Sequence, residues 1–241
     1  MVRPRIAARD LPSPNHDARP ADQPIDMLIL HYTGMRSAAE AIERLRDPAP
    51  PTRIPVSSHY VVEEDGTVRR LVPEERRAWH AGVSYWRGHR TLNGRSIGIE
   101  IVNPGHEFGY RPFPAIQLAA VCDLCLDIID RHPIPRRNVV GHSDVAPDRK
   151  QDPGELFPWQ DFADNGVGLW PAGPAAGAGP TDAADLLRAI GYDVPPDADA
   201  GVGAIALTAF QRHWRPERVD GQADAGTLAQ LAAVAAECDR G

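Results

Sequence analysis

The stretch from Gly141 to Gly154, GHSDVAPDRKQDPG, governs how the rest of this chain is interpreted. It places a histidine, a lysine and several carboxylates between the apolar run 138–140 and a proline-rich exit. Such a concentration of charge is costly unless it binds something, and imidazole with carboxylate suits Zn²⁺. A catalytic zinc takes three protein ligands and leaves a fourth position to water. His142 and Asp152 can supply two ligands if the chain doubles back, so the third must come from elsewhere.

Length, composition and charge limit the classes of protein to which the chain can belong. With 241 residues, 42% of them hydrophobic, it can bury a core as one large domain or two smaller ones. A net charge of −7 argues against broad electrostatic binding to nucleic acid. No run approaches the roughly 18 to 20 apolar residues of a membrane span. Residues 1–10 lack the apolar core of a secretory signal, so we expect a cytoplasmic protein, or a periplasmic or envelope protein if a leader was removed.

Two of the three cysteines, Cys122 and Cys125, form a C-x-x-C pair. They lie in an apolar segment whose residues recur at helical spacing. A redox pair needs a loop or a helix N-terminus, and a zinc ribbon needs a second cysteine pair. The pattern therefore favours small core residues over redox or metal chemistry.

A strand and a helix are predicted near the start of the chain. Residues 27–30 (MLIL) form a continuous apolar run, which predicts a buried strand that ends at His31. Residues 37–46 carry apolar side chains at i, i+3, i+4 and i+7, which predicts an amphipathic helix. Ser37 is a suitable N-cap for this helix.

Further strands and helices alternate along the chain. The runs 59–63 and 67–72 flank a Glu-Asp-Gly sequence, which predicts a β-hairpin. A strand over 96–102, a long helix that ends near Arg131 and a strand over 138–141 follow. Because both hairpin and crossover connections occur, we expect an α/β fold in which helices pack on a mixed β-sheet.

Glu100 lies inside an apolar strand, between Ile99 and Ile101. Alternation places Glu100 on the opposite face, together with Gly98 and Val102. The more common situation for such a glutamate is an edge position with its carboxylate in water. A carboxylate buried in this run would instead be disfavoured as an anion, and its pKa would rise.

A change in composition divides the chain. Residues 171–180 are small, uncharged and punctuated by proline and glycine, which predicts a linker. We expect an N-terminal extension over residues 1–25, a main domain over 26–170 and a small domain of three amphipathic helices over 181–241. The extension has no periodicity and is expected to wrap the surface or fray.

Five motifs of the main domain occur in order. They are LHYTG at 30–34, VSSHY at 56–60, AWHAGVS at 78–84, SIGIE at 96–100 and the sequence at 141–154. Together they resemble the zinc-dependent N-acetylmuramoyl-L-alanine amidases of the amidase type 2 family, of the AmpD and AmiD type. The last residues, 181–238, resemble the three-helix peptidoglycan-binding domain over a shorter stretch.

The resemblance, carried over position by position, implies a set of site residues. His31, His142 and Asp152 would bind zinc, Glu100 would be the catalytic acid/base and Lys150 would stabilise the oxyanion. These residue types suit amide hydrolysis, since zinc lowers the pKa of bound water to about 7 and a buried glutamate can exchange protons near neutral pH.

Substrate contacts are predicted at four further positions. Arg149 is expected to bind a peptide carboxylate through paired hydrogen bonds. Trp79, His80 and Asn93 are expected to line the groove, and structural packing is an equal alternative for each of these three.

The implied reaction is hydrolysis of the amide bond between N-acetylmuramic acid, in its 1,6-anhydro form, and L-alanine of the stem peptide during peptidoglycan recycling. The expected partners are anhydro-muropeptides or murein. One alternative is an envelope amidase that acts on polymeric wall, as the C-terminal helices suggest. Another is a non-catalytic peptidoglycan-binding module, but the sequence keeps every residue that hydrolysis needs. The absence of an H-E-x-x-H motif argues against a zinc peptidase.

Overall fold

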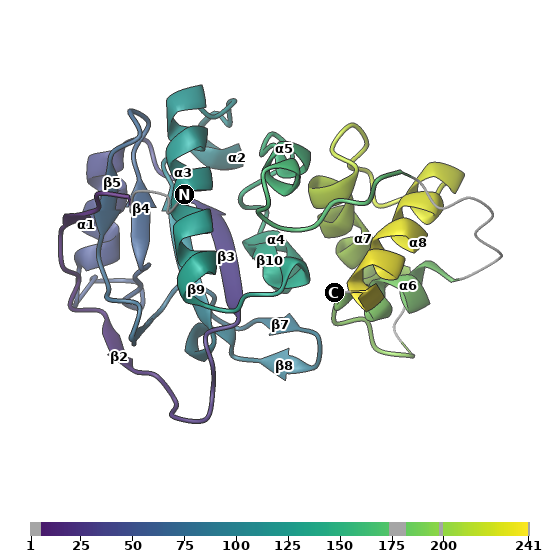
Figure 1. Ribbon diagram of the computed structural model, residues 1–241, viewed down its shortest axis with the longest axis horizontal. Helices are drawn as coiled ribbons and strands as arrows, with labels where there is room; N and C mark the ends of the chain where they lie inside the picture. The colour runs from purple at the N-terminus through teal and green to yellow at the C-terminus, as the bar shows by residue number, and fades with distance from the viewer. Residues whose placement is uncertain (1–5, 174–181, 198–199, 241) are drawn as a thin grey trace.

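The structure is a computed structural model that describes residues 6–173, 182–197 and 200–240. A six-stranded sheet carries helices on both faces, and three further helices lie beyond one edge of it (Figure 1). The strands are β1 (Arg9–Asp10), β2 (His16–Ala18), β3 (Met27–Tyr32), β4 (Tyr60–Val62), β5 (Val68–Arg70), β6 (Arg76–Ala78), β7 (Tyr85–Trp86), β8 (His89–Arg90), β9 (Ser96–Ile101) and β10 (Val139–Gly141). The helices are α1 (Ala38–Arg46), α2 (Gly105–Phe108), α3 (Ala115–Arg131), α4 (His142–Val145), α5 (Trp159–Asp164), α6 (Ala183–Ile190), α7 (Ala200–Trp214) and α8 (Ala225–Arg240), with 3₁₀ turns η1 (Leu92–Gly94) and η2 (Arg136–Asn138).

The strand order of the main sheet is β1-β5-β4-β9-β3-β10. Strands β10, β3, β9 and β4 pair in parallel, whereas β5 is antiparallel to β4. The sheet is therefore mixed, as predicted, and the expected hairpin is β4–β5. In the register of β3 and β9, His31 lies directly opposite Glu100.

One face of the sheet packs against α3. Alternate residues of β3 and β9, among them Leu28, Leu30 and Ile99, join a buried cluster with the apolar side of this helix. Cys125 is buried in the same cluster, where burial raises the pKa of its thiol, and Cys122 is half-buried beside it. Both cysteines lie inside a helix, as the spacing predicted. No helix among the described residues is both long and apolar enough to span a bilayer.

The opposite face of the sheet packs against α1 on one side. Val61 and Val102 contact Leu45 of this helix in a small buried cluster. Ser37 caps α1, because its side chain accepts a hydrogen bond from the backbone N–H of Glu40 (3.2 Å). The predicted helix and its cap are confirmed.

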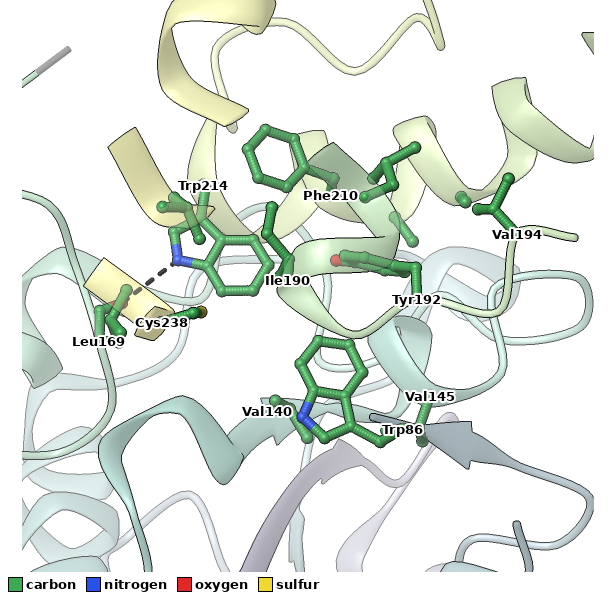
Figure 2. Packing of buried hydrophobic residues seen from close by; sticks show 14 of the residues in the cluster. Trp86, Val140, Val145, Leu169, Ile190, Tyr192, Val194, Phe210, Trp214 and Cys238 are labelled. Carbon is green, nitrogen blue, oxygen red and sulfur yellow. Dashed lines mark hydrogen bonds between the residues drawn. The ribbon is translucent and has the colours of Figure 1, made fainter. Parts of the chain in front are cut away.

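The three C-terminal helices, α6, α7 and α8, share a buried core with residues of β3 and β10, on the sheet face opposite α3. Trp86 of β7 meets Tyr192 edge to face with ring centroids 5.2 Å apart, in a cluster that also contains Val140 of β10 (Figure 2). Trp214 of α7 donates a hydrogen bond through Nε1 to the carbonyl oxygen of Leu169 at 3.2 Å (Figure 2). The helices are thus packed directly on the sheet domain.

The predicted division of the chain into domains remains a prediction. Residues 174–180 of the expected linker lie outside the described residues. The start of α6 is capped by Asp182, whose side chain accepts a hydrogen bond from the N–H of Ala184 (3.0 Å).

The N-terminal segment is more ordered than its sequence suggests. Strand β1 pairs with β5 and strand β2 pairs with β6, so residues 9–18 extend the sheets. Arg19 then donates hydrogen bonds to the carbonyl oxygens of Gly94 and Ser96, both at 2.9 Å, and approaches Nε2 of His59 at 2.8 Å. These are contacts with distant residues, which explains why local periodicity did not reveal them.

Candidate metal centre and active site

Two neighbouring strands bring the candidate ligands together. His31 is the fifth residue of β3, and His142 follows β10 directly as the first residue of α4. Because β10 pairs with β3 so that Gly141 lies opposite Leu30, the two histidines emerge side by side. The backbone N–H of Ser143 donates to the carbonyl oxygen of Asp152 (2.9 Å), which folds the following loop back onto the same place.

The ligand atoms of these three residues converge. Nδ1 of His31 lies 2.9 Å from Nδ1 of His142, and Oδ2 of Asp152 lies 3.0 Å from each of them. All three side chains are buried. Two ligands at 2.0–2.1 Å from a tetrahedral zinc are separated by about 3.3 Å, so the spacing is close to what such an ion requires.

The outer hydrogen bonds of His31 determine which of its nitrogens carries the proton. Ser96 Oγ donates to the carbonyl oxygen of Leu92 (2.8 Å), so it accepts from Nε2 of His80 (3.2 Å). The other nitrogen of His80, Nδ1, is then free to accept from Nε2 of His31 at 3.0 Å. The lone pair of His31 Nδ1 therefore faces the centre.

The same reasoning applies to His142. Its Nε2 lies 3.2 Å from the carbonyl oxygen of Ala81, which can only accept, so Nε2 carries the proton and Nδ1 carries a lone pair. Burial and the nearby His142 lower the pKa of His31 to about 4, which keeps that imidazole neutral near pH 7. Two imidazole lone pairs and a carboxylate thus meet in one buried place. This donor set repels itself unless a cation lies between its members, and it therefore fits a metal ion.

Glu100 lies beside this centre in a central strand. Strand β9 is flanked by β3 and β4, so the edge position considered from the sequence is wrong for Glu100. Its Oε2 is buried and has no hydrogen-bond partner among the described residues. Burial, with a smaller contribution from Asp152, raises the pKa of Glu100 to about 8, while Lys150 acts in the opposite direction. The carboxyl can therefore hold or release a proton near neutral pH.

Two of the candidate ligands, His142 and Asp152, line one cavity of about 460 Å³ together with Glu100. Lys150, Arg149, Trp79 and His80 also line it. This volume is within the range of pockets that enclose small ligands. The structure thus places seven of the nine predicted site residues on the lining of a single cavity, and the eighth, His31, contacts the lining residues His80, His142 and Asp152.

Asn93 is not among the cavity-lining residues, and its side chain bonds to the backbone of a neighbouring loop instead. Its Oδ1 accepts hydrogen bonds from the backbone N–H groups of His80 (3.1 Å) and Ala81 (2.7 Å). Asn93 therefore supports the loop that carries His80. This is the structural alternative considered for it above.

Arg149 is partly used by the protein itself. Its Nη2 donates to the carbonyl oxygen of Ala81 at 2.6 Å, and its Nε donates to that of Val83 at 3.2 Å. The guanidinium group therefore holds the loop over residues 81–83 against the segment that carries Lys150 through these hydrogen bonds. The backbone N–H of Arg149 donates a hydrogen bond to the carbonyl oxygen of Ala146 (3.2 Å), within the turn that precedes Lys150.

The contact between His80 and His31 was missed by sequence reasoning, which considered groove lining or structural packing for His80 but no bond to a candidate ligand. His80 packs on the backbone of Gly98, where a Cβ atom would lie 2.5 Å from the imidazole ring. A glycine inside a strand can mark such a close approach. This was the one local signal of the contact in the sequence.

Comparison with known proteins identifies the family. The family model described as N-acetylmuramoyl-L-alanine amidase matches residues 21–155. AmiD, an N-acetylmuramoyl-L-alanine amidase of Escherichia coli (strain K12), is 42% identical over 229 residues, which are 85% of this chain and 80% of AmiD. The 1,6-anhydro-N-acetylmuramyl-L-alanine amidase AmpD of the same strain is 35% identical over 170 residues, which are 65% of this chain and 91% of AmpD.

Solved structures agree with this result. The complex of E. coli AmiD with the substrate anhydro-N-acetylmuramic acid-L-Ala-D-gamma-Glu-L-Lys aligns with a TM-score of 0.79 and 39% identity, over 90% of this chain and 91% of AmiD. AmpDh3 from Pseudomonas aeruginosa, in complex with anhydromuramic pentapeptide, aligns with a TM-score of 0.77 and 34% identity, over 88% and 92% of the two chains. This chain therefore belongs to the family of N-acetylmuramoyl-L-alanine amidases.

Proposed function

We propose that this enzyme uses zinc to hydrolyse the amide bond between anhydro-N-acetylmuramic acid and the L-alanine of the stem peptide, in peptidoglycan recycling. The observation that carries the proposal is the meeting of three buried electron-pair donors at 2.9–3.0 Å, two of which, on His142 and Asp152, belong to side chains that line the same cavity as Glu100. The anhydro-muropeptides bound by AmiD and AmpDh3 support this class of substrate.

The proposed zinc ligands are His31, His142 and Asp152. Two imidazoles and one carboxylate match the three-ligand composition of catalytic zinc sites. The Nε2–H group of each imidazole donates a hydrogen bond to an acceptor outside the centre, as zinc-bound histidines do. When bound, zinc would polarise a carbonyl group and make hydroxide available near pH 7.

Glu100 is the proposed acid/base. Its Oε2 has no hydrogen-bond partner within the described part of the chain, and its pKa of about 8 is close to working pH. It can therefore accept the proton of the attacking water and return it to the nitrogen of the leaving L-alanine. Such proton transfer contributes typically 10²–10⁴-fold to the rate.

Lys150 is the proposed oxyanion stabiliser. It lines the same cavity as Glu100 and Asp152, and its ammonium group would oppose the negative charge that develops on the carbonyl oxygen. Trp79 and Arg149 line that cavity too and are proposed to contact the sugar or the peptide.

Mass spectrometry of the products tests the proposal. The wild-type enzyme should release free stem peptide from anhydro-muropeptide, and Glu100→Gln should not, while the exposed control Glu75→Gln keeps full activity. Equal release by Glu100→Gln would exclude the proposed acid/base. Bound zinc without any release would instead favour the non-catalytic binding module.

Action on polymeric wall is the second candidate, and one observation favours it. The match to AmiD covers 85% of this chain, whereas the match to AmpD covers 65%. The proposed C-terminal domain over residues 181–241 would then bind glycan near the catalytic domain. Release of stem peptide from intact sacculi at a rate similar to that from soluble anhydro-muropeptide would support this alternative.

The proposed cellular location depends on whether the substrate is soluble anhydro-muropeptide or polymeric wall. We retain the cytoplasm as the proposed location, because the proposed substrate is a soluble recycling intermediate. Fractionation of cells that express the native gene tests this. Recovery of the protein with the envelope would favour the wall-degrading alternative.

A further inference from the structure

A buried carboxylate, Asp144, lies two residues beyond the candidate ligand His142. It is only 1% exposed and belongs to the short helix α4. Its Oδ2 accepts a hydrogen bond from the backbone N–H of Gly141 at 2.7 Å. This bond spans His142 and holds the backbone from which its imidazole projects.

The other two partners of Asp144 come from the C-terminal helices. The hydroxyl of Tyr192, just after α6, donates to Oδ1 at 2.6 Å. Nδ1 of His213, in α7, lies 2.7 Å from Oδ2. A carboxylate can only accept, so His213 is the donor in this pair. The carboxylate thus joins two segments that are 48 and 69 residues away in sequence.

Both donors are held firmly in place. Tyr192 is 1% exposed and packs edge to face on Trp86, as Figure 2 shows. His213 is 2% exposed and stacks on Trp159 with ring centroids 3.8 Å apart. A rigid pair of donors from the C-terminal helices therefore fixes the orientation of Asp144.

We propose that Tyr192 and His213 are positioning residues for the metal centre, acting through Asp144 on the backbone of His142. The C-terminal helices would then be part of the zinc site in addition to any contact with the cell wall. This inference rests on the proposed function, because it assumes that His142 binds zinc.

Zinc affinity of the full-length chain tests the inference. Competition with a chelator should give a zinc Kd roughly 10 to 100-fold weaker for Tyr192→Phe and His213→Ala than for wild type, which is the usual effect of losing a group that orients a ligand. The visible absorption spectrum of the Co²⁺-substituted protein should change in the same variants. His213→Asn keeps an N–H donor near the position of Nδ1 and should restore most of the affinity.

A matched control separates positioning from general loosening of the interface. Arg87→Ala removes hydrogen bonds from the sheet domain to the carbonyl oxygens of Ala189 (3.1 Å) and Ile190 (2.7 Å) in α6, and leaves Asp144, Tyr192 and His213 in place. The zinc Kd of this control should stay within about 3-fold of the wild-type value. Its Co²⁺ spectrum should be the same as that of wild type. Circular dichroism verifies that each variant is folded.

The possible failures are distinguishable. If wild type binds zinc and the Tyr192 and His213 variants bind it equally well with the same Co²⁺ spectrum, the positioning role is excluded and the proposed function stands. Equal weakening in Arg87→Ala, or no recovery in His213→Asn, also overturns the positioning role. A wild-type protein that binds no zinc overturns the proposed function itself, and this inference with it.

Discussion

Replacing Glu100 with glutamine should change how the stability of the metal-free enzyme depends on pH. In the folded chain the pKa of Glu100 is raised to about 8 by burial and by Asp152, whereas the ordinary value is 4.5. Between these two pH values the folded state binds more protons than the unfolded state, so the wild-type protein loses stability as pH rises. Glutamine does not titrate and has no such loss.

The expected size of this effect follows from the pKa difference. At 1.36 kcal/mol per pH unit, a rise from 4.5 to about 8 corresponds to about 5 kcal/mol. The free energy of unfolding of Glu100→Gln, minus that of wild type, should therefore be several kcal/mol larger at pH 9 than at pH 4. Most of this change should fall between pH 4.5 and pH 8.

Urea unfolding followed by circular dichroism, with metal removed by a chelator, measures this difference. The exposed Glu75→Gln serves as the control and should give a difference from wild type that does not vary with pH. A flat difference for Glu100→Gln as well, or one that shrinks as pH rises, would refute the conclusion that Glu100 is a buried carboxyl held neutral in the folded protein.

Three further substitutions test neighbouring parts of the site. His80→Ala removes the acceptor for Nε2 of His31 and should weaken zinc binding about 10 to 100-fold. Chelator competition measures this loss, and the exposed control His89→Ala should bind zinc as tightly as wild type. Lys150→Ala should lower kcat about 10²-fold or more while zinc content stays at one per chain; unchanged kcat in steady-state assays would exclude its role. Asn93→Ala removes the acceptor for the backbone N–H groups of His80 and Ala81 and should lower the melting temperature by several degrees. An unchanged melting temperature would show that this loop needs no support from Asn93.

Local patterns in the sequence were sufficient to predict the parts of the fold that depend on periodicity. An apolar repeat or a turn sequence predicted each of three elements correctly: the helix after Ser37, the hairpin of β4 and β5, and the long helix α3. The resemblance to a known family then pointed to the positions that the structure brings together: His31, His142 and Asp152.

Contacts between distant segments could not be predicted in this way. The pairing of His80 with His31 depends on how the loop over residues 79–82 lies across β9, which no periodicity encodes. The bonds of Tyr192 and His213 to Asp144 depend on the docking of the C-terminal helices. The helical spacing of these segments indicated that they bury an apolar side, but not which surface they bury it against.

The central claim is that two imidazoles and one carboxylate of this chain hold a zinc ion beside Glu100. The most direct measurement is an anomalous difference map at the zinc absorption edge, from crystals of the purified enzyme. The account predicts one peak per chain, about 2.0–2.2 Å from Nδ1 of His31, Nδ1 of His142 and Oδ2 of Asp152. No peak in zinc-soaked crystals, or a peak bound by other residues, would contradict it.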